Sequence, residues 1–142
     1  MTSLSQPVTK SRHQISLLLR ESGINPTPQR VNIAALLLER KQHISADEIL
    51  AGVNRNSSLV SKATVYNTLN LFVEKGLIRE VLIDPSRVFY DSNTCPHHHM
   101  YNVDTGQLTD IAAADLHIDK LPQLPEGVSL EGVDLIIRVK NG

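Results

Sequence analysis

Three consecutive histidines, His97, His98 and His99, follow Cys95 in the interior of the sequence. Imidazole nitrogens and thiolate sulfur are ligands of transition-metal ions and of haem iron. If the run begins a β-strand, His97 and His99 point to one face and His98 to the other, because side chains alternate along a strand. Asp110 would add a carboxylate from the partner strand of a hairpin. The cluster predicts a site for a divalent metal (Fe²⁺, Mn²⁺ or Zn²⁺) or for haem.

A second group of residues has the chemistry of DNA contact. Ser61 is expected to cap a helix over 62–75 whose apolar residues form one buried stripe. The residues off this stripe are polar and include no acid before Glu74. Basic side chains there can contact phosphate, and methyl, phenol and amide groups can reach bases or sugars; the alternative is a merely solvated helix face. The predicted DNA contacts are Arg30, Lys62, Thr64, Tyr66, Asn67 and Arg87, with Arg79 as a further phosphate contact.

The elements that must position these residues are helices in the first half of the chain. A helix containing Ile15 is expected to end at Gly23, and Thr27 is expected to cap the next one. The spacing of Ser45 and Glu48 is that of a capping box. After the helix over 62–75, strands are predicted at 77–83 and 88–90 around a turn. Helices followed by a hairpin form a winged helix, in which the last helix reads the major groove.

The second half of the chain is expected to form a small sheet. Strands at 100–103 and 108–111 flank a turn, a third strand is expected at 133–139, and the intervening prolines prevent a long helix. Because three strands make a small sheet, a homodimer is predicted. The predicted class is α+β: an N-terminal winged-helix DNA-binding domain (1–90), then a small α/β dimerisation and sensor domain (91–142).

Charge separates the two halves. Residues 1–90 hold 11 Lys and Arg against 7 Asp and Glu, and residues 91–142 hold 3 against 8. The basic half suits DNA and the acidic half suits cations, unless the segregation is chance. The single cysteine excludes an intramolecular disulfide, and neither an apolar run of membrane-spanning length nor a secretory signal is evident. These features predict a cytoplasmic protein with no membrane partner.

Five short motifs resemble those of one family of bacterial regulators. They are Pro28-Gln29-Arg30, His43-Ile44-Ser45-Ala46, Ala63-Thr64-Val65-Tyr66, Gly76-Leu77-Ile78 and His97-His98-His99. Together they resemble the ferric uptake regulator (Fur) family over most of the chain. This resemblance implies a transcriptional repressor, and not an enzyme, that binds an AT-rich palindromic operator in double-stranded DNA.

The resemblance also implies which residues hold the regulatory metal: His43, Asp91, His97, His99 and Asp110. It assigns His43 to the DNA-binding half and the others to the hinge and sensor domain, so that one metal ties the domains together and sets their angle. A second site is only partly present. His98 and His117 stand at expected positions, but no histidine near Val133 completes the set.

Cysteine content points to one branch of the family. Many members hold structural zinc with two Cys-x-x-Cys pairs, which this chain lacks, so a structural tetrathiolate zinc is excluded. This absence, the histidine run and the tail over 118–138 are most similar to the iron response regulator (Irr) branch. Members of that branch respond to haem through the histidine run, and Cys95-Pro96 resembles a haem-regulatory motif. His98 is the first candidate for the haem ligand and Cys95 the second.

Three alternatives remain open from the sequence. The nearest is a repressor activated by Mn²⁺ or Fe²⁺ at the same five ligands without haem. A non-haem iron enzyme is another, because two histidines and one aspartate can form a facial triad with open positions. A metal-storage protein would leave the winged helix without a purpose.

Overall fold

The computed structural model describes residues 10–40, 42–55, 60–94 and 97–142. The chain divides into two compact units, 1–94 and 95–142. Helices lie mainly in the first unit, and each unit contains a small sheet, which confirms the α+β class. Within the described ranges, every helix is too short or too polar to cross a membrane.

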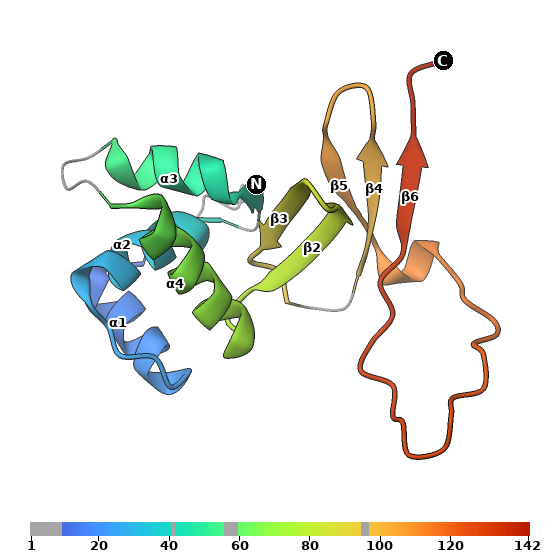
Figure 1. Cartoon of the computed structure of the whole chain (residues 1–142), viewed down its shortest axis with the longest axis horizontal. Coiled ribbons are helices and arrows are strands. Elements are labelled where there is room, and N and C mark those ends of the chain that lie inside the picture. Colours follow the sequence, from blue (N-terminus) through green and yellow to red (C-terminus); the bar gives the residue numbers. More distant parts are fainter. Residues whose placement is uncertain (1–9, 41, 56–59, 95–96) are drawn as a thin grey trace, which may run out of the picture. The chain divides into compact units, whose positions relative to one another are not determined.

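Four helices of the first unit begin where the sequence places hydroxyl caps (Figure 1). They are α1 (Arg12–Glu21), α2 (Pro28–Leu37), α3 (Ala46–Asn54) and α4 (Lys62–Glu74). In each, the side chain of the preceding Ser or Thr accepts a hydrogen bond from a backbone N–H of the first turn. The full reciprocal capping box is at Ser11 and Gln14. At Ser45, the hydroxyl instead donates to the Glu48 carboxylate.

Helix α4 packs on the centre of the first unit. Val65, Leu69 and Phe72 are fully buried, as the apolar stripe predicted, while Val73 is half-buried and Thr68 lies in the buried face. The helix ends at Gly76, which has φ +76°. The Gly76 and Leu77 N–H groups donate to Val73 and Phe72 carbonyls, so the glycine turns the chain out of the helix.

The sheet of the first unit has the order β1-β3-β2 and is antiparallel. Its strands are β1 (His43–Ser45), β2 (Arg79–Asp84) and β3 (Arg87–Asp91). Hairpin β2–β3 is the predicted wing, although β2 begins at Arg79 because the preceding residues complete the turn after Gly76. Strand β1 was not predicted; three residues beside a helix cap are too few to show an alternating pattern.

The sheet of the second unit has the order β5-β4-β6 (Figure 1). Strands β4 (His98–Asn102) and β5 (Leu108–Ile111) form the predicted hairpin, and β6 (Ile136–Val139) joins β4 in parallel. The sequence predicted β6 from residue 133, but the residues before Ile136 are not in a strand. The C-terminal end is held by the Asn141 N–H, which donates to the Asp104 carboxylate.

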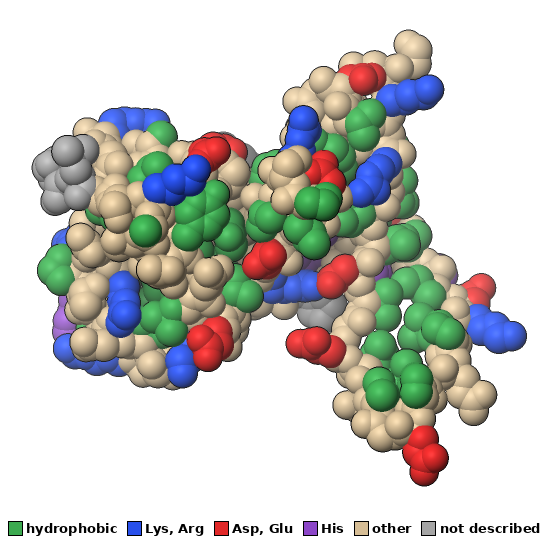
Figure 2. All heavy atoms as spheres, viewed as in Figure 1, with side chains coloured by type: hydrophobic (Ala, Val, Ile, Leu, Met, Phe, Trp, Pro, Cys, Tyr) green, Lys and Arg blue, Asp and Glu red, His purple; other side chains and the backbone are tan. Residues whose placement is uncertain are grey.

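The chain between β5 and β6 contains only a short 3-10 helix, η1 (Ala113–Asp115). Beyond it, residues 116–135 leave the sheet as an irregular excursion and return at β6 (Figure 1). Apolar side chains gather on this excursion (Figure 2). Its exposed large apolar residues are Ile118, Leu121, Leu124, Val128, Leu130 and Val133.

Candidate metal centre and DNA-contacting face

The hairpin β4–β5 brings two histidines and one aspartate together within the second unit. His99 and Asp110 are direct partners in the β4–β5 ladder. Asp110 Oδ1 lies 3.2 Å from His97 Nε2 and 3.5 Å from His99 Nε2. The alternation expected from a strand is seen in the burial, with His97 and His99 buried and His98 half-buried.

The imidazole rings of His97 and His99 pack against each other. The rings of His97 and His99 meet edge to face, with centroids 4.5 Å apart and an interplanar angle of 62°. His97 is 8% and His99 3% exposed, whereas the Asp110 side chain is 43% exposed. Two nitrogen donors and one carboxylate form a donor set that fits Fe²⁺, Mn²⁺ or Zn²⁺.

A second His–Asp pair lies within the first unit. His43 on β1 and Asp91 on β3 are register partners, and His43 Nε2 lies 3.2 Å from Asp91 Oδ2. Asp91 is 1% exposed, and its Oδ1 accepts a hydrogen bond from the Asn93 N–H. A buried carboxylate requires such partners, because burial without them is costly. By chain contacts Asp91 lies in the first unit, three residues before its end at residue 94; the family resemblance assigned it to the hinge and sensor domain.

The residues proposed for a second metal or haem site are not drawn together in the same way. His98 Nδ1 accepts a hydrogen bond from the Leu135 N–H, which leaves Nε2 as its ligating atom. His117 is exposed on the excursion. In the part of the chain that the structure describes, neither belongs to a group of three or more metal-ligating side chains. Cys95 lies outside the described residues.

The predicted DNA contacts lie mainly on the exposed stripe of α4. Lys62, Tyr66 and Asn67 are exposed, and the Lys62 ammonium lies 5.8 Å from the centre of the Tyr66 ring. Arg87 is exposed at the start of β3, in the wing, and Arg79 begins β2. The helix and the hairpin therefore present these side chains from one folded unit.

A polar pocket of about 280 Å³ lies between α4 and the start of α2, and no carboxylate lines it. Arg30 is held there by a hydrogen bond from Nη1 to the Asn25 carbonyl, 3.0 Å away. A guanidinium, hydroxyls and a helix N-terminus together suit a phosphate. The lining residues are Thr27, Gln29, Arg30, Thr64, Asn67 and Thr68.

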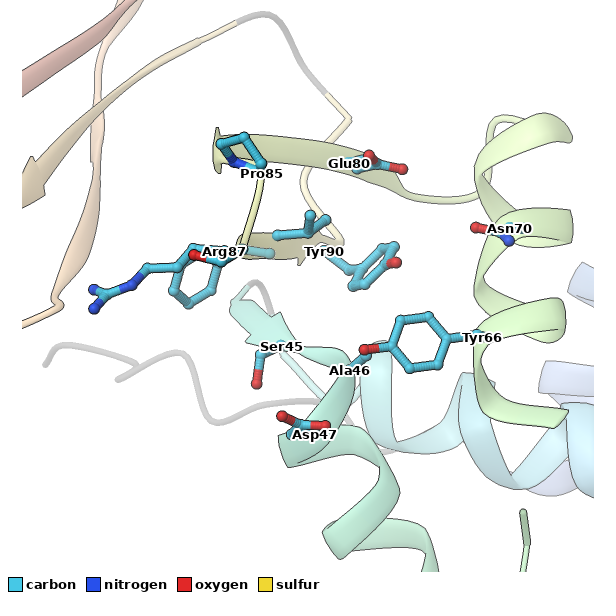
Figure 3. Close-up of a pocket in the computed structure, with 12 residues that line it drawn as sticks. Ser45, Ala46, Asp47, Tyr66, Asn70, Glu80, Pro85, Arg87 and Tyr90 are labelled. Carbon is cyan, nitrogen blue, oxygen red and sulfur yellow. The ribbon is translucent and has the colours of Figure 1, made fainter. Parts of the chain in front are cut away.

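A larger cleft lies on the other side of the exposed stripe of α4 (Figure 3). It was not predicted from the sequence. Its walls come from the start of α3, from α4 and from β2–β3. Burial, followed by the nearby Glu80 carboxylate and Tyr66, raises the pKa of the Tyr90 phenol above its ordinary value of 10.0. Residues from two helices and three strands line the cleft, and no local sequence motif signals such an assembly.

Comparison with known proteins assigns the chain to a family. The model of the Ferric uptake regulator family matches residues 21–138. The peroxide-responsive repressor PerR of Staphylococcus aureus (strain Mu50 / ATCC 700699) is 34% identical over 106 residues, which are 74% of this chain and 72% of that protein.

Comparison with solved structures finds the same fold in ferric uptake regulators. The ferric uptake regulator from Pseudomonas aeruginosa with manganese aligns with a TM-score of 0.69 at 25% identity, covering 89% of this chain and 96% of that one. The ferric uptake regulator from Francisella tularensis with iron has the same fold, with a TM-score of 0.68 at 24% identity, covering 84% and 92%.

A winged helix joined to a small sheet that bears a His/Asp metal site defines a metal-responsive transcriptional regulator, and not an enzyme. The chain belongs to the ferric uptake regulator family.

Proposed function

We propose that this protein is a DNA-binding repressor of iron homeostasis whose affinity for its operator is set by a divalent metal at the β4–β5 hairpin. The observation that carries the proposal is the convergence of His97, His99 and Asp110, with both imidazole nitrogens within 3.5 Å of one carboxylate oxygen. Asp110 is partly exposed, so solvent and a metal ion can reach the cluster.

We further propose that His43 and Asp91 complete the ligand set. The family resemblance assigns them to the same regulatory site as the three residues of the hairpin, and the His43–Asp91 pair lies in the first unit. Ligands supplied by both units would let one metal restrict their relative orientation. The bound ion would then favour the arrangement that fits DNA, which is a population shift.

The proposed target is an AT-rich palindromic duplex bound by a homodimer. A two-fold symmetric dimer presents one recognition helix to each half-site. The exposed apolar side chains of the excursion support dimerisation, because a second copy of the chain would remove them from water. The pocket at Arg30 supports a backbone phosphate contact beside α4.

A finer proposal is that the protein belongs to the Irr branch and releases DNA on binding haem. The support is the half-buried His98, whose Nε2 can ligate iron while its Nδ1 accepts a hydrogen bond from the Leu135 N–H. The iron of a bound haem would then have His98 Nε2 as an axial ligand.

A second candidate is a response to peroxide, which the name of the Staphylococcus aureus relative suggests. Two histidines and one carboxylate can hold Fe²⁺ with open positions, which is a site that peroxide can approach. Loss of DNA binding on adding peroxide to the Fe²⁺-loaded protein, but not to the Mn²⁺-loaded protein, would support this candidate.

The deciding experiment is fluorescence anisotropy of a labelled AT-rich palindromic duplex. Protein is titrated alone, with Mn²⁺ or Fe²⁺, and with haem, at two salt concentrations. Binding that requires divalent metal supports the metal-activated repressor, and binding that haem releases supports the Irr-like one. Absence of salt-sensitive binding to this duplex and to a pool of random duplexes under all conditions would refute DNA binding.

A further inference from the structure

The cleft beside α4 has the size of a small-ligand site. Its volume is about 390 Å³, within the range of roughly 300–1,000 Å³ that ligand pockets occupy. Tyr66 reaches into it from α4 and Tyr90 from β3, while Asp47 lies at the start of α3 (Figure 3). All of these residues belong to the first unit.

Two acids and one base line the cleft, and a second base, Lys62, has its ammonium 5.8 Å from the centre of the Tyr66 ring. Asp47 and Glu80 line it from opposite walls, and the guanidinium of Arg87 turns away from the two tyrosines (Figure 3). The positive end of α3 is offset by Asp47 and Glu48 in its first turn. Two carboxylates between protein walls concentrate a negative potential in the concave space. Burial, and after it the Glu80 carboxylate, raises the pKa of the Tyr90 phenol, which lines the same cleft.

The remaining walls also favour a cation. Three aromatic side chains, Tyr66, Phe89 and Tyr90, contribute rings whose faces carry partial negative charge. Asn70 adds an amide oxygen that can accept a hydrogen bond from a cationic N–H donor. The polar pocket at Arg30, on the opposite side of the α4 stripe, has the reverse chemistry, because it contains a guanidinium and no acid.

We propose that the cleft between α3, α4 and the β2–β3 hairpin binds a small organic cation of the guanidinium class. A guanidinium is planar, so it stacks on a phenol ring while its edge donates to carboxylates. Asp47 and Glu80 are the charged partners, and Tyr66 and Tyr90 form the stacking walls.

Occupancy of the cleft has a consequence for DNA, which rests on the function proposed above. Tyr66 both lines the cleft and is the largest exposed side chain in the proposed DNA-contacting stripe. A ligand stacked on its ring holds the side chain over the cleft and so weakens its contact with DNA.

The test uses isothermal titration calorimetry on the full chain without DNA, with propylguanidinium as the probe. Neutral propylurea has a similar shape without the charge, and methyl phosphate is the anionic comparison. We expect propylguanidinium to bind saturably, and neither propylurea nor methyl phosphate to do so. Glu80→Gln and Asp47→Asn should each weaken it about tenfold, as loss of a charge-assisted hydrogen bond does. Glu74→Gln, an exposed acid of α4 outside the cleft, should leave it unchanged.

Three results would overturn the proposal: no saturable heat with propylguanidinium, equal binding by the folded Glu80→Gln and Asp47→Asn variants, or preference for methyl phosphate. In a DNA titration, propylguanidinium should weaken binding more than KCl of the same ionic strength, and Glu80→Gln should reduce that difference. An unchanged operator affinity with the cation bound would refute the coupling to Tyr66. Operator binding without any cation binding would refute the proposed cation site in the cleft and would not contradict the proposed repressor function.

Discussion

His99 and Asp110 face each other across the β4–β5 ladder, and the His99 imidazole nitrogen lies 3.5 Å from the Asp110 carboxylate oxygen. The pairing places an imidazole ring against a carboxyl group on adjacent strands, where the backbone fixes both Cα positions. His97, just before β4, brings a second nitrogen to the same oxygen. The geometry of this cluster of two histidines and one aspartate is therefore set largely by the register of one hairpin.

Removal of either ring should abolish tight metal binding. We expect His97→Ala and His99→Ala each to weaken Mn²⁺ binding at least about tenfold, since loss of even an outer-shell partner costs 10- to 100-fold. Calorimetry with Mn²⁺ measures the affinity, and circular dichroism checks that the fold persists. His13→Ala, an exposed histidine of α1, is the matched control. Unchanged metal and haem responses in both ligand variants would refute the proposed sensory site.

Loss of a ligand in the winged-helix unit should separate metal binding from DNA binding. Asp91→Asn preserves the size of a side chain that is 1% exposed but removes its charge. We expect this variant to retain metal at the hairpin with weakened affinity, and to lose the metal dependence of operator binding. Parallel Mn²⁺ and DNA titrations measure both quantities. If Asp91→Asn kept a full metal response, Asp91 would not be a regulatory ligand.

Arg30 should contribute a phosphate contact that does not depend on DNA sequence. We expect Arg30→Ala to weaken binding to specific and random duplexes alike, and to reduce the slope of log affinity against log salt by about 1. Anisotropy over a series of KCl concentrations provides the slope. Arg20→Ala, an exposed arginine in the last turn of α1, removes the same charge away from the polar pocket. An identical salt slope for Arg30→Ala and the wild type would rule out the contact.

Tyr90 should titrate later than an ordinary tyrosine, because burial raises its pKa above 10.0. The folded state then holds the phenolic proton more tightly than the unfolded state does. The contribution of Tyr90 to the free energy of unfolding is therefore complete below the pKa that the phenol has in the unfolded chain. It declines as the pH rises above about 10. The chain has three tyrosines, and ultraviolet titration of their phenolates detects the one that ionises at the highest pH. Tyr90→Phe should remove it; persistence of the late transition in that variant would assign it elsewhere.

Gly76 should be required for the turn that leads from α4 into the wing. An alanine at φ +76° is strained by about 1–2 kcal/mol, so Gly76→Ala should lower the free energy of unfolding by that amount. Gly76→Asn should lose less, because asparagine tolerates this conformation. Gly132→Ala, at a glycine without positive φ and with open space around its Cβ position, is the control. Urea denaturation measures all three, and equal stability of Gly76→Ala and wild type would refute the requirement.

Much of the fold could be predicted because its signals are local. Thr27, Ser45 and Ser61 each cap a helix through a residue three positions later, and Gly76 ends α4 with a conformation that glycine favours. The hairpin with strands at 100–103 and 108–111 could be predicted from the glycine in its turn, and Asp110 could be placed on the partner strand. The structure begins the first strand at His98, which makes His99 the ladder partner of Asp110. These features depend on residues that are close in sequence.

The features that could not be predicted depend on distant parts of the chain. Strand β1 is three residues long and exists because it pairs with β3, nearly fifty positions later. Strand β6 is shorter than the stretch predicted at 133–139, because its register pairs with β4 begin only at Ile136. The cleft requires α3, α4 and the wing to be packed before its acids and rings share one space.

The parallel pairing of β6 with β4 has a consequence for the order of folding. Hairpin β4–β5 closes over a few residues, whereas Leu135 reaches His98 across a separation of 37 residues. Short loops close sooner than long ones, and parallel strands joined by long connections are slow to form. We therefore expect the proposed ligands His97, His99 and Asp110 to be assembled on a segment that folds before β6 pairs. A metal ion captured there would bias the nascent chain towards the native register before the third strand of its sheet arrives.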